Sequence, residues 1–188
     1  MALLRGINVG GRNKVAMRDL RAAFQAEGYD SVATYIQSGN VLFAAEATGT
    51  ELESGIELEP RIEAMLHRRL GLQLVVVVRA REQMRQVVAK APEGFGSAPD
   101  TYHSDVIFLK APLTSDQAMQ VVTLREGVDQ AWPGSGVLYF QRLTARRTQS
   151  RLSTILGKPE YQQMTIRSWS TTTKVLGLLE DQAPVSSR

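Results

Sequence analysis

The sequence predicts an α+β protein of two tandem ferredoxin-like domains (α/β plaits) with antiparallel sheets, and three observations lead to this prediction. The first half reads strand, helix, strand, strand, helix, strand, the split βαβ order of such a domain. The right-handed preference of crossovers leaves few other compact solutions for that order. The second half repeats the theme after a loop rich in Gly and Pro, residues 92–103. We therefore expect domains over residues 1–79 and 80–181, and a flexible tail over 182–188.

Apolar spacing and turn residues define the elements of the first half. Met17, Leu20 and Phe24 recur at helical spacing. Ser38 and Gly39, between two β-rich runs, indicate a two-residue hairpin. The elements expected are a strand over 2–9, a helix from 17 that stops at Gly28, strands over 32–37 and 40–45, a helix through 62–70 that stops at Gly71, and a buried strand over 72–78.

The second half contains the same kinds of element, with one gap. Thr114 followed by Gln117 is the capping-box pattern that begins a helix. No run of residues predicts a fourth strand, so we expect this plait to lack that strand or to rebuild it. The elements expected are a helix over 81–90, a strand over 105–110, a helix from 114, strands over 127–132 and 137–143, and helices over 150–156 and 170–180.

The composition excludes several classes of protein. The 188 residues are 43% apolar and 22% charged, the balance of an ordinary globular protein. No stretch approaches the roughly 20 apolar residues of a membrane span, and Arg5 and Asn8 interrupt any secretory signal, so we expect a cytoplasmic protein with no membrane partner. The absence of cysteine excludes disulfides and thiolate nucleophiles. The net charge of +3 is too small to imply a nucleic-acid partner.

The distribution of charge carries more information than its total. Residues 1–21 contain five basic side chains and one acidic one, and residues 142–174 contain seven and one. Residues 46–59 contain five glutamates and no base, and these lack the ligand spacing of a calcium loop. Solvated helix faces would explain all three segments. The alternative that they allow is an anionic ligand or partner.

The stretch RGINVGGRNK precedes the first expected helix and has the geometry of a general anion site. The first backbone N–H groups of a helix have no internal partner, and Val15 and Ala16 cannot cap them with a side chain. Arg12 and Lys14 flank those groups with positive charge, which suits a phosphate or a carboxylate. The glycines match neither a P-loop nor a dinucleotide-binding motif. A plain turn, with water on the helix end, is the competing interpretation.

Strand alternation predicts a second constellation in the first half. Gly6 and Asn8 fall on one face of the first strand, and Tyr35 and Gln37 fall on one face of the second. Because a plait covers one sheet face with helices, we expect these four residues on the open face. That face would bind a ligand, pack on the other domain or stay in contact with water.

Other chemistries receive less support from the residues. Plaits include RNA-binding domains, but Arg5 stands where a stacking aromatic is needed, which leaves backbone binding by the basic segments as the weaker nucleic-acid option. The two histidines, His67 and His103, lie far apart, so we expect no metal and no cofactor. His103 would have Ser104 or Asp105 as a neighbour, although adjacent residues of a strand point in opposite directions.

Three stretches resemble the signature blocks of the uncharacterised bacterial family of domain of unknown function DUF1697. They are ALLRGINVGGRNKVAMRDLR, TYIQSGNVLF and IRSWSTTTKVLGLLE, and they occur in the family's order over nearly the whole chain. The resemblance implies two tandem plaits and brings no established activity, substrate or cofactor. Ser168 and Ser170 stand where the family usually has asparagines, so shorter hydroxyls replace both amides.

These observations favour a binding module for an anionic, phosphate- or carboxylate-bearing ligand. In the C-terminal block, the Trp169 indole lies close in sequence to Arg167 and Lys174. It would form one wall of a ligand site, or it would anchor the last helix. A small-molecule hydrolase or transferase and a structural, self-associating protein are the alternatives, and the oligomeric state stays open. The expected ligand-binding residues are Arg5, Asn8, Gly10, Gly11, Arg12, Asn13, Lys14, Tyr35, Gln37, Ser38, Asn40, Arg167, Trp169 and Lys174.

Overall fold

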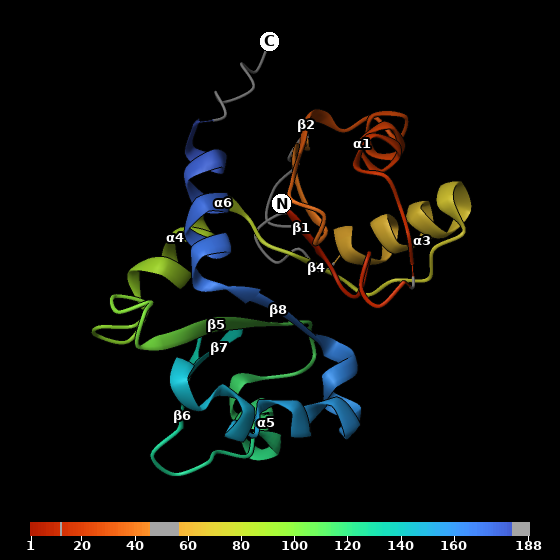
Figure 1. The fold of residues 1–188 in the computed structure, drawn as a ribbon. Coiled ribbons are helices and arrows are strands. Elements are labelled where there is room, and N and C mark those ends of the chain that lie inside the picture. Colours follow the sequence, from red (N-terminus) through yellow and green to blue (C-terminus); the bar gives the residue numbers. More distant parts are fainter. Residues whose placement is uncertain (12, 46–56, 182–188) are drawn as a thin grey trace. The chain divides into compact units, whose positions relative to one another are not determined.

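A computed structural model describes residues 1–11, 13–45 and 57–181, and the chain forms two compact units. The first unit comprises Met1–Met84 together with the chain from Val175, and the second comprises Arg85–Lys174. The division falls inside helix α4 (Arg81–Ala89) and inside helix α6 (Trp169–Asp181), both visible in Figure 1. Each unit contains one four-stranded antiparallel sheet with helices, the α+β architecture that the sequence predicts.

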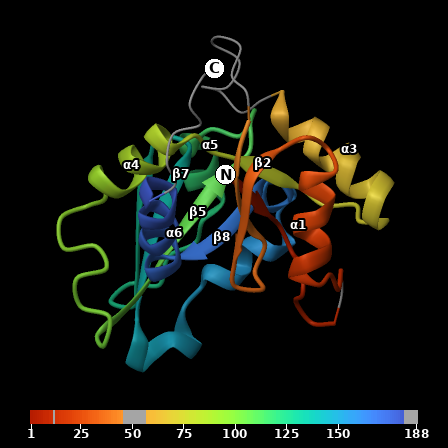
Figure 2. The same cartoon turned by 90° about the horizontal axis from the view of Figure 1, so that it is seen from above.

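The first unit is a plait whose two helices cover one face of the sheet (Figure 1, Figure 2). The strand order is β2-β3-β1-β4, and all pairs are antiparallel. Leu20 and Phe24 of one helix and Ile62 of the other pack with apolar residues of the sheet. The elements are β1 (Ala2–Leu4), α1 (Met17–Gln25), β2 (Asp30–Tyr35), β3 (Asn40–Ala44), α3 (Leu58–Leu70) and β4 (Val76–Val78).

The first unit differs from expectation at its turns. Strand β1 ends at Leu4 instead of residue 9, because Gly6 and Asn8 take left-handed φ angles of 69° and 53°. The β2–β3 connection contains four residues, 36–39, since Tyr35 pairs with Asn40. The expected stop of the second helix is confirmed, because the residue after α3 is a glycine with φ 66°.

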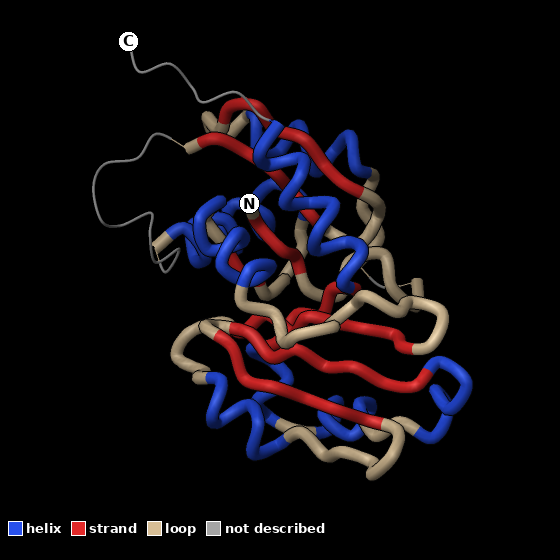
Figure 3. The backbone as a smooth tube through the Cα atoms, turned by 90° about the vertical axis from the view of Figure 1, so that its left-hand side faces the viewer, coloured by secondary structure: helices blue, strands red, loops and turns tan. Residues whose placement is uncertain are grey.

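The second unit repeats the plait with strand order β6-β7-β5-β8. Figure 3 shows the strands in red and the helices in blue. The capping box is confirmed: Gln117 N donates to Thr114 Oγ1 at 3.2 Å, and Thr114 N donates to Gln117 Oε1 at 3.0 Å. One sheet face packs against α5 and the 3-10 turns that follow β7. The elements are β5 (Tyr102–Leu109), α5 (Ser115–Val121), β6 (Asp129–Gly134), β7 (Val137–Leu143), η1 (Thr144–Gln149), η2 (Leu152–Gly157), η3 (Pro159–Gln163) and β8 (Met164–Ser168).

Of the two alternatives for the fourth strand of this plait, that it is missing was wrong. Strand β8 pairs with β5 along its whole length, from Met164 opposite Leu109 to Ser168 opposite Asp105. The helix expected over 150–156 is a set of short 3-10 turns instead. Gly157 and Pro159 disfavour a longer α-helix there. The chain then returns to the sheet as β8.

Candidate functional site

Two loops of the first unit lie together and are called the paired loops below: the first contains the described residues 6–11 and 13–15, and the second contains residues 36–39. Asn8 joins them: its Nδ2 donates to Val15 O at 3.0 Å and to Gln37 O at 3.2 Å. Its Oδ1 accepts from Val15 N at 2.9 Å. Asn13 ties the first loop to itself, because its Nδ2 donates to Gly6 O at 3.1 Å. The structure therefore brings together the first two blocks that the sequence singles out.

The second of the paired loops has a strained and fixed conformation. Ile36 takes φ 48° although it is β-branched, which is uncommon in proteins, and its side chain is 48% exposed. Asn40 is buried, and its Nδ2 donates to Tyr35 O and to Ser38 Oγ. Gly39 has φ 78°, and a Cβ there would lie 2.9 Å from Leu4 Cβ. Backbone strain of this kind is held in place by its surroundings and often marks functional loops.

The start of α1 lies at the end of the first loop. Ala16 occupies the N-cap position, and no side chain of the described residues caps the helix. Lys14 is exposed two residues before it. Arg12, which the sequence places in the same site, lies outside the described residues. Backbone N–H groups without a side-chain cap, next to a lysine, can donate hydrogen bonds to a negatively charged group.

The expected grouping on the open sheet face was wrong. Alternation ends with β1, and Ala2 and Leu4 belong to the helix-covered core. Ile7, only 1% exposed, also lies in that core. Residues 5–9 therefore form a loop and do not continue β1. Asn8 nevertheless reaches Gln37 through the contact between the loops rather than across a sheet face.

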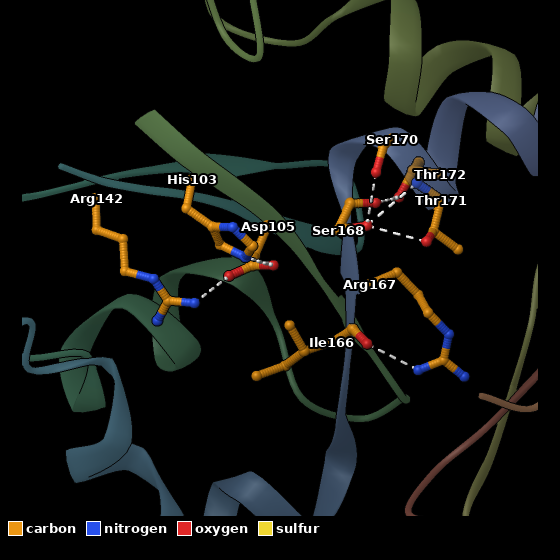
Figure 4. A network of polar contacts seen from close by, with 9 residues as sticks. All are labelled: His103, Asp105, Arg142, Ile166, Arg167, Ser168, Ser170, Thr171 and Thr172. Atoms are coloured by element: carbon orange, nitrogen blue, oxygen red, sulfur yellow. Dashed lines mark hydrogen bonds and ion pairs between the residues drawn. The ribbon is translucent and has the colours of Figure 1, made fainter. Parts of the chain in front are cut away.

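Three expected site residues belong to the second unit: Arg167, Trp169 and Lys174. Arg167 on β8 is 7% exposed, and its Nη1 donates to Thr165 Oγ1 at 2.9 Å. The same Nη1 donates to Ile166 O at 2.8 Å (Figure 4). Burial lowers the pKa of Arg167 to about 10, so the guanidinium keeps its charge at neutral pH. Trp169 packs edge-on against Phe95 with ring centroids 5.1 Å apart. Lys174 is exposed on α6.

Ser168 is engaged at the start of α6. Its Oγ accepts from Thr171 N at 3.2 Å and contacts the Thr171 and Ser170 hydroxyls (Figure 4). Thr172 Oγ1 donates to the Ser168 carbonyl at 3.0 Å. A serine at this position therefore performs the capping that an asparagine would also perform.

The sequence interpretation missed a charged cluster on β5 and β7. Asp105 contacts His103 Nε2 through Oδ1 at 3.2 Å and accepts from Arg142 Nη2 through Oδ2 at 3.0 Å (Figure 4). The sequence named Asp105 as one of two possible neighbours of His103 and did not name Arg142. Residues i and i+2 of a strand share a face, which is the signal that would have favoured Asp105 over Ser104. The carboxylate orients the imidazole, an arrangement used in acid–base chemistry and in purely structural ion pairs.

We expect Asp105 to make stability depend on pH. Burial raises its pKa above the ordinary 3.8, against the opposing effects of His103, Arg142 and Arg147. The Asp105 carboxyl therefore binds its proton at a higher pH in the folded chain than in the unfolded chain. The stability that this difference contributes is complete below pH 3.8, and it is lost as the pH rises through the raised pKa of the folded state. Urea unfolding from about pH 4 to neutral pH checks this against Asp105→Asn. A pH-independent difference between the two proteins would contradict it.

The first unit also contains a cavity of about 700 Å³ between the α1–β2 turn and α3. Tyr29, Arg61 and Arg68 are among its lining residues. Glu27 binds Arg68 at 2.7 Å and Arg69 at 3.1 Å, so acidic and basic groups are already paired at its rim. The described residues contain no cluster of metal ligands, and none of their helices is long and apolar enough to cross a membrane.

Comparisons with known proteins agree with this architecture. A family model described as "Protein of unknown function (DUF1697)" matches residues 1–139. No curated protein matches the chain. The solved structure of the conserved bacterial protein SP0830 from Streptococcus pneumoniae is similar, with a TM-score of 0.77 and 24% sequence identity over 95% of this chain and 96% of that chain. At this identity the likeness shows the fold.

Proposed function

The chain belongs to the DUF1697 family, whose description assigns no function, and we propose that it binds an anionic ligand carrying a phosphate or a carboxylate at the paired loops. The observation that carries the proposal is the uncapped start of α1 beside Lys14, held against the 36–39 loop by Asn8. Backbone N–H groups and Lys14 supply hydrogen-bond donors, and the loops contain no carboxylate. The carboxylate in the first turn of α1, Asp19, is paired with Arg18 at 3.2 Å.

Preorganisation supports the same proposal. The Asn8 and Asn13 amides are used inside the protein, so they hold the loops in shape instead of contacting the ligand. Left-handed residues, Gly10 and Gly11 among them, turn the first loop toward the helix start. A loop already held in its binding conformation loses less entropy when the ligand arrives.

We expect Lys14→Ala to weaken binding of inorganic phosphate, pyrophosphate or citrate about tenfold, since a hydrogen bond to a charged group contributes about 1.5 kcal/mol or more. Isothermal titration calorimetry of the full chain measures this. The melting temperature should not change, because Lys14 is exposed. Arg21→Ala, which removes an exposed charge further along α1, is the matched control and should bind like wild type.

Equal weakening by both substitutions would show a diffuse charge effect and would contradict a site at the paired loops. Failure of all three anions to bind the wild-type chain would contradict the proposed function itself. The two alternatives stay predictions: turnover of a phosphorylated compound would favour a hydrolase or transferase, and concentration-dependent association would favour a structural role.

A further inference from the structure

The second unit gathers five arginines at one end of its sheet. Four of them lie within residues 142–151, which include the end of β7 and all of η1. The fifth, Arg125, comes from the segment before β6. The arginine cluster is defined as Arg125, Arg142, Arg146, Arg147 and Arg151.

Asp129 holds the two segments of the cluster together. Its Oδ2 accepts from Arg125 N at 3.0 Å and from Arg151 N at 2.8 Å. Arg142 is its neighbour across the β6–β7 ladder. Arg146 Nη1 adds a contact to Gly127 O at 3.4 Å. Asp129 is 6% exposed, and its carboxylate accepts hydrogen bonds from backbone N–H groups. Among the described residues it forms no ion pair with the surrounding guanidinium groups.

The exposed members of the cluster are available to a ligand. The side chains of Arg147 and Arg151 form no hydrogen bond and no ion pair with any residue that the structure describes, and both residues are exposed. Arg146 contacts neutral groups, with Nη2 donating to Gln149 Oε1 at 2.9 Å. The one carboxylate that pairs with the cluster is Asp105, through Arg142, among the described residues.

Polar atoms beneath the surface also lack partners. Arg142 Nε and Asp129 Oδ1 are both buried and have no hydrogen bond within the described part of the chain. These two residues are cross-strand partners. Arg142 Nε is a buried donor that an anion can accept from, whereas Asp129 Oδ1 belongs to a carboxylate and needs a donor such as water. Native proteins rarely leave such atoms unsatisfied, and a bound polar group or water usually occupies the space beside them.

From these observations we propose a second anion site, at the arginine cluster, that recognises a phosphate group. Guanidinium forks match phosphate oxygens in paired, charge-assisted hydrogen bonds, so three or more arginines favour phosphate over a singly charged carboxylate. The site belongs to the second unit and does not depend on the function proposed for the paired loops. The phosphate belongs to a small phosphorylated compound or to a nucleic-acid backbone, and the experiment separates these two sources.

The test compares an Arg147→Ala/Arg151→Ala chain with wild type. Pyrophosphate is titrated by calorimetry, and a fluorescently labelled oligouridylate is titrated by polarisation at two salt concentrations. We expect the double variant to bind at least about tenfold more weakly, because each arginine lost removes a charge-assisted contact. Arg21→Ala/Lys90→Ala removes the same charge from exposed positions on other elements and should bind like wild type.

The outcomes are distinguishable from those of the paired loops. Loss confined to Arg147→Ala/Arg151→Ala supports the arginine cluster, and loss confined to Lys14→Ala overturns it while leaving the proposed function intact. Weakening of oligouridylate binding, with a log–log salt slope of about −0.7 for each phosphate contacted, identifies a nucleic-acid backbone. Weakening of pyrophosphate binding alone identifies a small compound. Equal affinity of the double variant and wild type for both probes overturns the proposal.

Discussion

The Gly96→Ala variant is expected to lose about 3 kcal/mol of unfolding free energy. Gly96 has φ +74°, which costs an alanine about 1 kcal/mol. An added Cβ would also overlap the indole of Trp169, whose Cδ1, Nε1 and Cγ are the nearest atoms. The indole ring is rigid, so no single atom of it can move aside, and the whole Trp169 ring must shift.

Displacement of Trp169 would disturb an aromatic cluster in the second unit. Phe95 lies at its centre, with ring centroids 5.1 Å from Trp169, 5.3 Å from Tyr139 and 6.1 Å from Trp132. The Tyr139 hydroxyl donates to Val87 O at 2.7 Å, which links the cluster to α4. Urea unfolding followed by tryptophan fluorescence measures the loss, because the chain contains only these two tryptophans.

Gly94→Ala is the matched control. Gly94 has the same φ of +74°, but the nearest atom to an added Cβ is Ser97 Oγ at 3.8 Å. This variant should lose only the backbone contribution of about 1 kcal/mol. If both variants lose the same free energy, the packing of Gly96 on Trp169 is not what fixes the glycine. A large difference would favour Trp169 as the anchor of α6 over its alternative role as a ligand wall.

Sequence reasoning predicted the elements whose signal is local. The helices α1, α3 and α5 follow from apolar spacing, from a glycine after α3 and from a capping box before α5. Strand β8 was missed because its signal is short: Met164 and Ile166 alternate with Thr165 and Arg167 over only four residues, and both of these polar residues are buried. The sequence alone does not show that an arginine is buried, because its burial depends on the residues that the fold places around it.

The candidate sites divide in the same way. The open start of α1 follows from Val15 and Ala16, which cannot cap a helix. The contact of Asn8 with Gln37 joins residues 29 positions apart and depends on left-handed turns that end β1 early. The arginine cluster requires Arg125 to meet residues 142–151 through Asp129, a long-range contact with no sequence signature.

Glutamates of α3 cover the β4 edge of the first sheet, where Val76–Val78 are buried. Strand β4 is an edge strand, and its outward N–H groups would otherwise be open to another chain. Glu59 Oε1 accepts from Val78 N at 2.9 Å, and Glu63 Oε1 accepts from Val76 N at 2.8 Å. Four helical residues rise about 6 Å and two strand residues span about 6.7 Å, so side chains four apart on the helix reach N–H groups two apart on the strand.

We expect Glu59→Ala to lower the unfolding free energy by about 3 kcal/mol. The substitution removes the acceptor of Val78 N and the carboxylate 4.0 Å from Arg79 Nη1. Arg79 is buried, and burial already lowers its pKa, which shows that its charge is costly to hold there. Removing one partner of a buried pair leaves the other charge to be desolvated with less compensation. Urea unfolding measures the change.

Glu63→Ala is the control, because Glu63 is only partly buried and accepts from the same strand. It should lose about 1 kcal/mol, the contribution of a typical hydrogen bond. The double variant opens both N–H groups of the β4 edge and should associate at high concentration, which light scattering detects. If Glu59→Ala costs no more than Glu63→Ala, the ion pair with Arg79 is not a stabilising contact. If the double variant associates no more than the wild-type chain does, covering by α3 is not what keeps this edge from pairing.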